Sequence, residues 1–486
     1  MVRSKLPYVL CALAALGTAA CGSSPPAARP PRPPGAPAGP VVTDQARRGY
    51  EAAAARFAEH DKANDWNDAA CSQMAKEFLD VNAEHKRASG GDLSPALYNA
   101  GLSHQRCNRD AEAKKLFQQA LAADPKAHRA KVQVALYDYK EKGDAALEST
   151  IAALQQAVLD AEFQNTDALV NLAMLQLKRS GPNKGQGCSD DLECSKKNIQ
   201  RALAIDDGFM PAFNQLALYY LELARSKAGR AKGAGRLAAS GKRDKRVNNQ
   251  QLEFAALVCS QGIRKNPKYA PIHNTFGLIQ VELGNINNAV QEFKTAAQLD
   301  PGFVEAQMNF AAVNLSFRGF ENAETAYRQV LKARPNDYDA TLGLALALRG
   351  RITDQNLPQQ VKETQALIDR AKQIAPERPE AYYNEGILTQ EYKVKAVSDS
   401  KGQIPILEQA KGIYSSFIQK AGANPEYAEQ VKRAGERNKD IEDTIRFLRE
   451  GIKAEEDASK PLSDQPAGLE GDAAGAPAPA GGPNPK

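Results

Sequence analysis

Apolar side chains recur at helical spacing along most of the chain. One set follows the i, i+3, i+4, i+7 pattern of a helix face: Phe213, Leu216, Ala217 and Tyr220. This set predicts a helix over 210–224. Runs of Val, Ile or Thr are few, and the composition leans to Ala, Gln, Glu, Lys and Leu, which favours helices over strands. The pattern therefore predicts an all-α protein.

A sequence unit recurs within this helical pattern. Gly277 matches Ala311 and Pro301 matches Pro335, and both pairs are 34 residues apart. Two further matches lie between them: Ala289 with Ala323, and Phe293 with Tyr327. A third copy keeps the internal spacings: Gly101, Ala113, Phe117, Ala120 and Pro125. In the tetratricopeptide repeat, which these spacings resemble, the small residues sit where two antiparallel helices touch and the Pro ends the second helix.

The spacings resemble the tetratricopeptide repeat (TPR), a helix pair that stacks on its neighbours. The clearest copies are 94–127, 270–303 and 304–337. Weaker copies extend the array over 44–451, with long insertions between the helices of some pairs, and Tyr427 to Gly451 is predicted to be a C-terminal capping helix. The resemblance implies a TPR-type helical-hairpin solenoid, or superhelix, of about nine units.

Both ends of the chain are predicted to lie outside the solenoid. Residues 1–20 begin with basic residues, continue with an apolar stretch and end in small residues before Cys21, as a signal peptide does. Residues 21–43 form a Pro-rich linker, which is expected to stay extended. Residues 452–486 are rich in Ala, Pro and Gly and are expected to be disordered.

The residues before Cys21 resemble the lipobox of bacterial lipoproteins, in which small residues precede a Cys that becomes lipidated. Thr18 stands where that motif usually has Leu, so ordinary cleavage after Ala20, giving a secreted protein, is the alternative. Gly22 follows the Cys in place of the Asp that, by the bacterial sorting rule, retains lipoproteins in the inner membrane. The resemblance implies an outer-membrane lipoprotein that faces the periplasm.

Four cysteines are disulfide candidates on the helix-pair frame. Cys71 lies near the start of a second helix and Cys107 at the end of the next first helix, so antiparallel packing would bring the two together. Cys188 and Cys194 flank a short acidic stretch in a Gly-rich loop, where a disulfide would close a small ring. The alternative for this pair is a metal site with the neighbouring acids, but no further Cys pair or nearby His completes a zinc set. Cys259 is expected to be a buried free thiol.

No catalytic or cofactor signature stands out in the sequence. The five His residues show no HExxH spacing, and no GxSxG turn is present. His104 and His273 occupy ordinary first-helix positions, where a packing or surface role is expected. The 63 basic and 58 acidic residues give a net charge of +5, which does not indicate nucleic-acid binding. We therefore expect no enzyme activity, cofactor, metal or small-molecule substrate.

The insertion at 225–247 is the most strongly basic segment of the charge pattern, with many Lys and Arg and few acids. It is predicted to be a loop between a helix that ends near Ala224 and a second helix that begins near Gln251. Its glycines lack the preceding strand of a dinucleotide site and the spacing of a phosphate loop. A solvated insertion and a contact with anionic lipid, lipopolysaccharide, cell-wall polymer or an acidic protein are the interpretations that are left.

The concave face of a TPR solenoid is lined by the first helix of each pair, and by resemblance such faces bind protein segments. The positions that would line this groove are Tyr98, Leu102, Asn214, Leu218, Asn274, Leu278, Met308, Ala312, Tyr383 and Ile387. Leu102, Leu218 and Leu278 stand where a chaperone-binding subtype has the Asn residues of a carboxylate clamp. Apolar and amide contacts are expected instead, and packing between helices is the alternative role.

Over its whole length the chain resembles the TPR lipoproteins of the adventurous gliding-motility machinery of myxobacteria. The resemblance implies a non-catalytic scaffold, anchored by a lipid, that joins periplasmic and outer-membrane proteins in a motility or assembly complex. Two other roles share the anchor and the repeats: a type IV pilus or secretin pilot, and an outer-membrane assembly lipoprotein. A recruiter or regulator of a cell-wall hydrolase is a third alternative.

Overall fold

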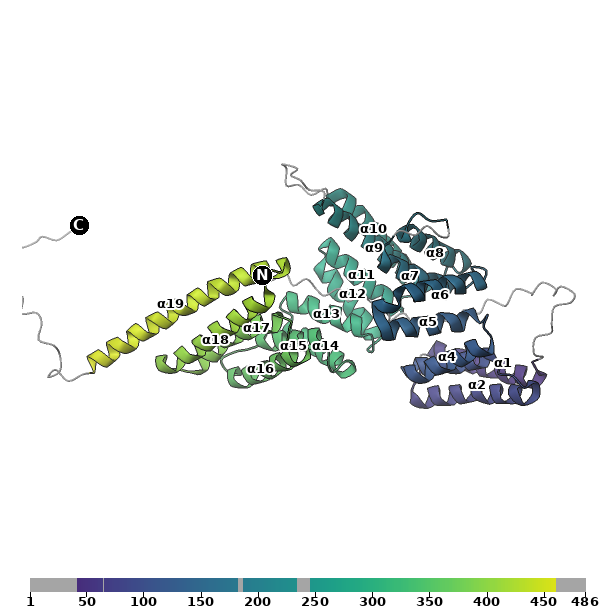
Figure 1. The fold of residues 1–486 in the computed structure, drawn as a ribbon, viewed down its shortest axis with the longest axis horizontal. Helices are drawn as coiled ribbons and strands as arrows, with labels where there is room; N and C mark the ends of the chain where they lie inside the picture. Colours follow the sequence, from purple (N-terminus) through teal and green to yellow (C-terminus); the bar gives the residue numbers. More distant parts are fainter. Residues whose placement is uncertain (1–41, 64, 182–186, 234–244, 460–486) are drawn as a thin grey trace, which may run out of the picture. The chain divides into compact units, whose positions relative to one another are not determined.

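The computed structural model describes residues 42–63, 65–181, 187–233 and 245–459, with side chains over the same ranges except 226–249. The predicted signal peptide, Cys21 and nearly all of the Pro-rich linker lie outside the described residues. The chain divides into two compact units, Met1–Pro335 (unit 1) and Asn336–Lys486 (unit 2). The elements described in both units are helices, as the sequence predicts (Figure 1).

Unit 1 is a series of antiparallel helix pairs, each packed on the next (Figure 1). Its elements in chain order are α1 (Asp44–Ala63), α2 (Asp68–Ser89), α3 (Ser94–Arg106), α4 (Asp110–Ala123), α5 (His128–Lys142), the short helix η2 (Gly143–Ala146), α6 (Leu147–Asp160), α7 (Thr166–Arg179), α8 (Asp191–Ile205), α9 (Met210–Gly233), α10 (Lys245–Lys265), α11 (Ala270–Leu283), α12 (Ile286–Leu299), α13 (Val304–Ser316) and α14 (Phe320–Ala333). The arrangement is the predicted helical-repeat solenoid.

The repeated small residues hold the two helices of a pair close together. A Cβ on Gly101 of α3 would lie 2.7 Å from the Phe117 ring of α4, and a Cβ on Gly277 of α11 would lie 2.6 Å from the Phe293 ring of α12. Both rings are buried in the core. Because a side chain at either Gly would overlap the ring, the small–aromatic spacing in the sequence reports a direct contact between helices.

The turns between pairs repeat as well. The side chain of Asp124 accepts the backbone N–H of Lys126 at 2.9 Å, and the side chain of Asp300 accepts that of Gly302 at 3.0 Å. Asp residues favour turns because their short side chains bond to the backbone two residues ahead. The acid before the repeat Pro therefore helps to end α4 and α12, the second helices of these two pairs.

The basic insertion is shorter than the sequence predicts. Helix α9 does not end near Ala224 but continues to Gly233, and α10 begins at Lys245, so only 234–244 lies outside the described backbone. The segment 225–233 has no Pro and is rich in Ala, Lys and Arg, which are good helix formers. Arg225 also bonds to Glu282 of α11 at 3.0 Å, which fixes α9 beyond the predicted end.

Unit 2 continues the pairing and ends in a long helix. Its elements are α15 (Tyr338–Gly350), α16 (Leu357–Ile374), α17 (Glu380–Leu388), the π-helical turn η3 (Thr389–Lys393), η4 (Val394–Ala396), α18 (Ser400–Ala421), η5 (Pro425–Tyr427) and α19 (Ala428–Ala458). In the described part of the chain, unit 1 holds seven helix pairs and unit 2 holds two, so the predicted number of about nine is confirmed.

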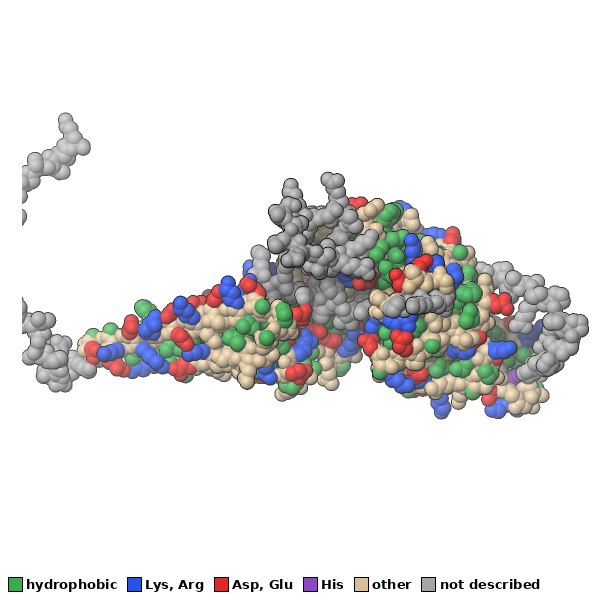
Figure 2. Space-filling view, turned by 45° about the horizontal axis from the view of Figure 1, so that its top comes forward, with side chains coloured by type: hydrophobic (Ala, Val, Ile, Leu, Met, Phe, Trp, Pro, Cys, Tyr) green, Lys and Arg blue, Asp and Glu red, His purple; other side chains and the backbone are tan. Residues whose placement is uncertain are grey.

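Helix α19 is the predicted capping helix, but it runs past Gly451 to Ala458, so the predicted tail begins later than residue 452. Lys401 of α18 pairs with Glu456 of these extra turns at 2.7 Å. Figure 2 shows acidic and basic side chains interspersed over the elongated part at the left of the view, where Figure 1 places α18 and α19. In the ranges that the structure describes, no helix combines the length and the apolar character needed to cross a membrane.

Candidate functional site

Three of the predicted groove residues are core residues. Asn274 is 1% exposed and accepts a hydrogen bond from the Asn309 side chain of the next first helix at 2.9 Å. Asn214 is also buried and accepts from Thr275 at 2.6 Å. These amides connect successive first helices and are not free to bind a partner, because they lie on the flank of the helix that faces the next repeat. The groove prediction is wrong for both.

Tyr383 of unit 2 is likewise a core residue. Its ring lies 5.0 Å from Phe417 and 6.0 Å from Tyr414 of α18, between ring centroids, and it is 7% exposed. The remaining predicted residues are partly exposed: Tyr98, Leu102, Leu218, Leu278, Met308, Ala312 and Ile387. Tyr98 also packs on Phe117 at 5.4 Å, so its ring is shared between the core and the surface. These partly exposed side chains are the part of the groove prediction that the structure leaves accessible.

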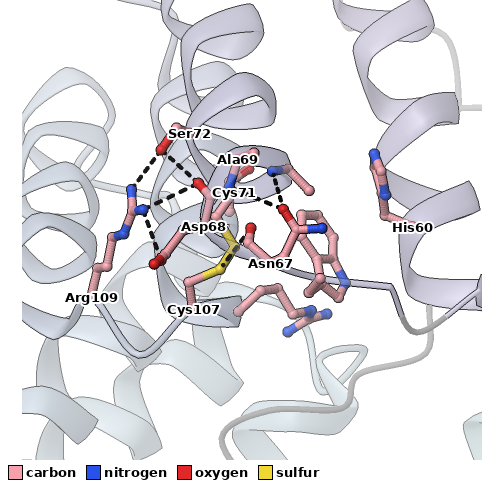
Figure 3. The surroundings of a disulfide bond; sticks show 12 residues. His60, Asn67, Asp68, Ala69, Cys71, Ser72, Cys107 and Arg109 are labelled. Carbon is pink, nitrogen blue, oxygen red and sulfur yellow. Dashed lines mark hydrogen bonds and ion pairs between the residues drawn. A yellow bond between two sulfur atoms is a disulfide. The ribbon is translucent and has the colours of Figure 1, made fainter.

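A disulfide joins the first two helix pairs (Figure 3). Cys71 in the first turn of α2 is bonded to Cys107, which follows the last residue of α3. Beside it, Arg109 donates to Ser72 Oγ at 2.8 Å and to Asp68 Oδ1 at 2.9 Å. The structure thus brings together the pair that antiparallel packing suggested, and the same ends are held by charged hydrogen bonds.

A second disulfide joins Cys188 to Cys194. Cys194 does not lie in a loop, as the sequence suggested, but in the first turn of α8, where it is buried. The helix begins early because the Asp190 side chain accepts the backbone N–H of Glu193 at 2.8 Å and caps it. This disulfide therefore ties the preceding segment to the start of a helix.

The acids near this disulfide are occupied by protein groups. Asp191 is buried and receives two hydrogen bonds of 2.7 Å from Arg179. Glu193 pairs with Lys197, and this bond with those from Ser189 lowers the pKa of Glu193 to about 2. Within the described ranges, no cluster of three or more His, Cys, Asp or Glu is placed to hold a metal ion. The geometry favours the disulfide over the metal site for these residues.

His273 on α11 connects three segments of one repeat. Its Nδ1 lies 2.7 Å from Glu292 Oε2 of α12, and its Nε2 lies 2.9 Å from the Pro267 carbonyl oxygen. Both partners are acceptors, so both ring nitrogens carry a proton when the two bonds are made. Burial lowers the pKa of His273, but the bonds to Glu292 and Pro267 outweigh burial and raise it overall. The side chain has the structural role that its position predicted.

The surroundings of His104 and Cys259 also indicate a structural role. His104 is partly buried, and burial lowers its pKa. Cys259 is a buried free thiol, and burial raises its pKa, which keeps it in the unreactive thiol form.

Two charged residues with unusual surroundings were missed by the sequence analysis. Asp167, in the first turn of α7, makes no side-chain hydrogen bond or ion pair with any described residue, and burial raises its pKa. Arg349, at the end of α15, is partly buried and has no carboxylate partner within the described residues. Neither belongs to a motif, because a single charge on an amphipathic helix is the commonest feature of such a sequence.

A family model of the tetratricopeptide repeat matches residues 94–126 and 270–303. These are the helix pairs α3/α4 and α11/α12, in which the Gly–aromatic contacts lie. The chain therefore contains tetratricopeptide repeats within a helical solenoid. Such repeats commonly bind other proteins, so the repeats point to a protein-interaction scaffold.

The chain is similar to the Hsp70-Hsp90 organizing protein 1 of Glycine max, with 24% identity over 237 residues, which is 47% of this chain and 40% of that protein. A match to the Hsp70-Hsp90 organizing protein of Triticum aestivum has 26% identity over 23% of this chain and 20% of that protein. The matches thus span less than half the length of these relatives. A solved structure, a thermophilic TPR protein of Thermus thermophilus, has 23% identity over 46% of this chain and 100% of that chain, with a TM-score of 0.36.

Proposed function

We propose that this tetratricopeptide-repeat chain is a non-catalytic scaffold of a bacterial envelope machine. It is held at the outer membrane by a lipid on Cys21 and faces the periplasm. Its partners are periplasmic and outer-membrane proteins, and the machine is the gliding-motility apparatus that the sequence resembles. The scaffold part rests on the repeats, and the envelope part rests on the cysteines.

The two disulfides are the observation that carries the envelope location. Cys71 with Cys107 and Cys188 with Cys194 account for every described cysteine except Cys259. Disulfides persist in oxidising compartments such as the periplasm and are rare in the cytosol. They support export of the chain, in agreement with the signal-peptide-like sequence at 1–20.

The helix pairs support a scaffold that contacts several proteins. Within each unit the described helix pairs pack on their neighbours in sequence, so each unit offers several separate first-helix surfaces. Partly exposed first-helix residues such as Leu102, Leu278 and Met308 provide apolar contacts for a docked protein segment.

Crosslinking and purification of the full chain from intact cells tests the scaffold. We expect recovery of periplasmic and outer-membrane proteins, and loss of surface movement when the chain is deleted. Leu278→Lys should weaken recovery without unfolding the protein, whereas Lys268→Glu, at an exposed turn position, should not. Recovery of cytoplasmic proteins alone, or turnover of peptidoglycan by the purified chain, would contradict the proposal.

The intact mass of the mature protein tests the anchor. We expect a diacylated species that begins at Cys21, and Cys21→Ser should move the chain from the membrane fraction to the periplasmic fraction. A mature protein with an unmodified Cys21 would remove the anchor from the proposal and leave a secreted scaffold.

A further inference from the structure

Arg349 in unit 2 has donors that the protein does not use. Its Nη1 donates to the Asn384 side-chain oxygen at 2.9 Å and weakly to the Asn384 carbonyl oxygen at 3.4 Å. The amide of Asn384 is itself fixed, because its Nδ2 donates to the Glu380 carbonyl oxygen at 2.8 Å. The N–H groups on Nε and Nη2 have no acceptor in the described part of the chain. A guanidinium held on one side by a fixed amide is therefore left with a free edge.

Titratable groups from three further elements of unit 2 act on the charge of Arg349. Glu391 and Tyr392 of η3, Tyr414 of α18 and Arg437 of α19 lie close enough to change the pKa of Arg349. Burial is the largest effect and lowers the pKa of Arg349, as expected for a cation without a direct anionic partner. The π-helical turn η3 is a rare backbone form that often occurs at functional sites.

The charges at this position leave one positive charge uncompensated. Arg437 pairs with Glu391 at 2.7 Å and also donates to Gln390 Oε1 at 2.7 Å. Glu391 is thereby directed to Arg437 and not to Arg349. The Tyr392 hydroxyl makes no hydrogen bond with any described residue, and its ring packs against the apolar cluster that includes Leu342 and Ala345 of α15.

We propose that Arg349, with Tyr392 beside it, binds the carboxylate of an acidic side chain on a protein segment that docks along α15, η3 and α19. A guanidinium edge with two parallel N–H groups matches a carboxylate in geometry. A phosphate dianion fits less well, because Arg437 is paired with Glu391 and only the single charge of Arg349 is free. The inference rests on the proposed scaffold function and names the chemistry of one partner contact.

The test uses the full chain and two fluorescein-labelled peptides, read by fluorescence anisotropy at low salt. One peptide has Glu and Leu at helical spacing and an amidated C-terminus, and the other has Gln in place of each Glu. We expect wild type to bind the Glu peptide about tenfold more tightly than the Gln peptide, the scale of one hydrogen-bonded charge. Arg349→Gln should abolish the difference, and Arg349→Lys, which keeps the charge but not the planar edge, should reduce it.

Matched controls separate this site from general charge effects. Arg433→Gln removes an arginine of α19 whose one ion pair with a described residue is to Glu429 of the same helix, at 3.0 Å, and should leave the difference unchanged. Acetate should compete with the Glu peptide, and inorganic phosphate at equal ionic strength should compete less. Equal competition by phosphate would contradict a carboxylate site.

Other outcomes would also overturn the inference. These are equal binding of both peptides by wild type, binding of neither, or an unchanged preference in folded Arg349→Gln. If Arg349→Gln does not fold, two other measurements test the inference. These are the binding of both peptides by Arg349→Lys and the competition of acetate and phosphate with the Glu peptide on wild type. A chain truncated after Ala458 that binds the Glu peptide much more tightly would identify the chain's own tail as the occupant. Envelope proteins that crosslink equally to wild type and Arg349→Gln would refute this site alone, whereas their absence from wild type would refute the scaffold.

Discussion

Arg106 at the end of α3 donates two hydrogen bonds to the carboxylate of Asp61 near the end of α1, at 2.8 and 3.0 Å. The two side chains are only 9% and 15% exposed. Trp66 also donates to Asp61, at 2.9 Å, and the Arg106 guanidinium lies 5.5 Å from the centre of the Phe57 ring. One carboxylate therefore connects α1, the loop before α2, and α3. Removal of one member of a buried pair leaves the other charge without compensation.

Asp61→Ala should destabilise the N-terminal helix pair strongly. We expect a loss of about 3 kcal/mol in the free energy of unfolding of this region, because Arg106 stays behind as a buried cation. Trp66 is the only Trp of the chain and contacts Asp61, so urea denaturation followed by its fluorescence reports this region directly. Asp44→Ala, on the same helix but with its partner Arg47 well exposed, should change the midpoint little. Equal midpoints for wild type and Asp61→Ala would refute the stabilising role.

The Cys71–Cys107 disulfide should stabilise the same region. The residues are 36 apart in sequence, and closure of such a loop restricts the unfolded chain by about 4 kcal/mol in the entropic account. The double variant Cys71→Ser, Cys107→Ser should thus move the Trp66 unfolding transition to lower urea. Loss of the Cys188–Cys194 disulfide, with a separation of 6, should cost about 2 kcal/mol and leave the Trp66 transition unchanged. A reducing agent that does not shift the wild-type transition would show that the first disulfide does not form.

The sequence predicts the helix pairs well because their packing imposes strict residue sizes. Gly277 must be small where it meets the Phe293 ring, and such a pair recurs at a fixed spacing that a single sequence reveals. The groove was harder to predict. Asn274 faces the next first helix and bonds to Asn309, so its role depends on the rotation of one helix against its neighbour, which periodicity does not specify. The end of α9 was missed because a run of Lys, Ala and Gly is compatible with a loop as well as a helix end, and the contact of Arg225 with Glu282 is long-range.

The bonds of His273 predict a stability that falls as pH rises. Although burial lowers its pKa, the bonds to Glu292 and Pro267 raise the pKa in the folded protein above the ordinary value of about 6.5. Protonated His273 therefore stabilises the fold fully below about pH 6.5, and this contribution is lost as pH rises through the folded-state pKa. The thermal unfolding midpoint of wild type should fall over this window more than that of His273→Gln. Glu292→Gln, which removes the main cause of the raised pKa, should resemble His273→Gln, and parallel pH curves for all three proteins would contradict the assignment.

Asp167 should act on stability in the opposite direction to a paired acid. Burial raises its pKa, and the charges of Arg129 and Arg106, which act the other way, do not compensate. The ionised carboxylate therefore costs stability at neutral pH, and the cost disappears as pH falls through the folded-state pKa toward the unfolded value of about 3.9. Asp167→Asn should raise the free energy of unfolding at neutral pH by on the order of 1 kcal/mol, with no gain at low pH.

Asp92 is the matched control for this prediction. Hydrogen bonds from Asn82 and Lys86, at 3.0 and 3.1 Å, lower its pKa, so its ionised form stabilises the fold. Asp92→Asn should accordingly destabilise the protein at neutral pH and have less effect at low pH, because the wild-type bonds weaken once Asp92 is protonated. Chemical denaturation of both variants at neutral and acidic pH measures the opposite changes that the two substitutions make in the free energy of unfolding. If Asp167→Asn destabilised the chain as Asp92→Asn does, Asp167 would have to be paired in the folded protein.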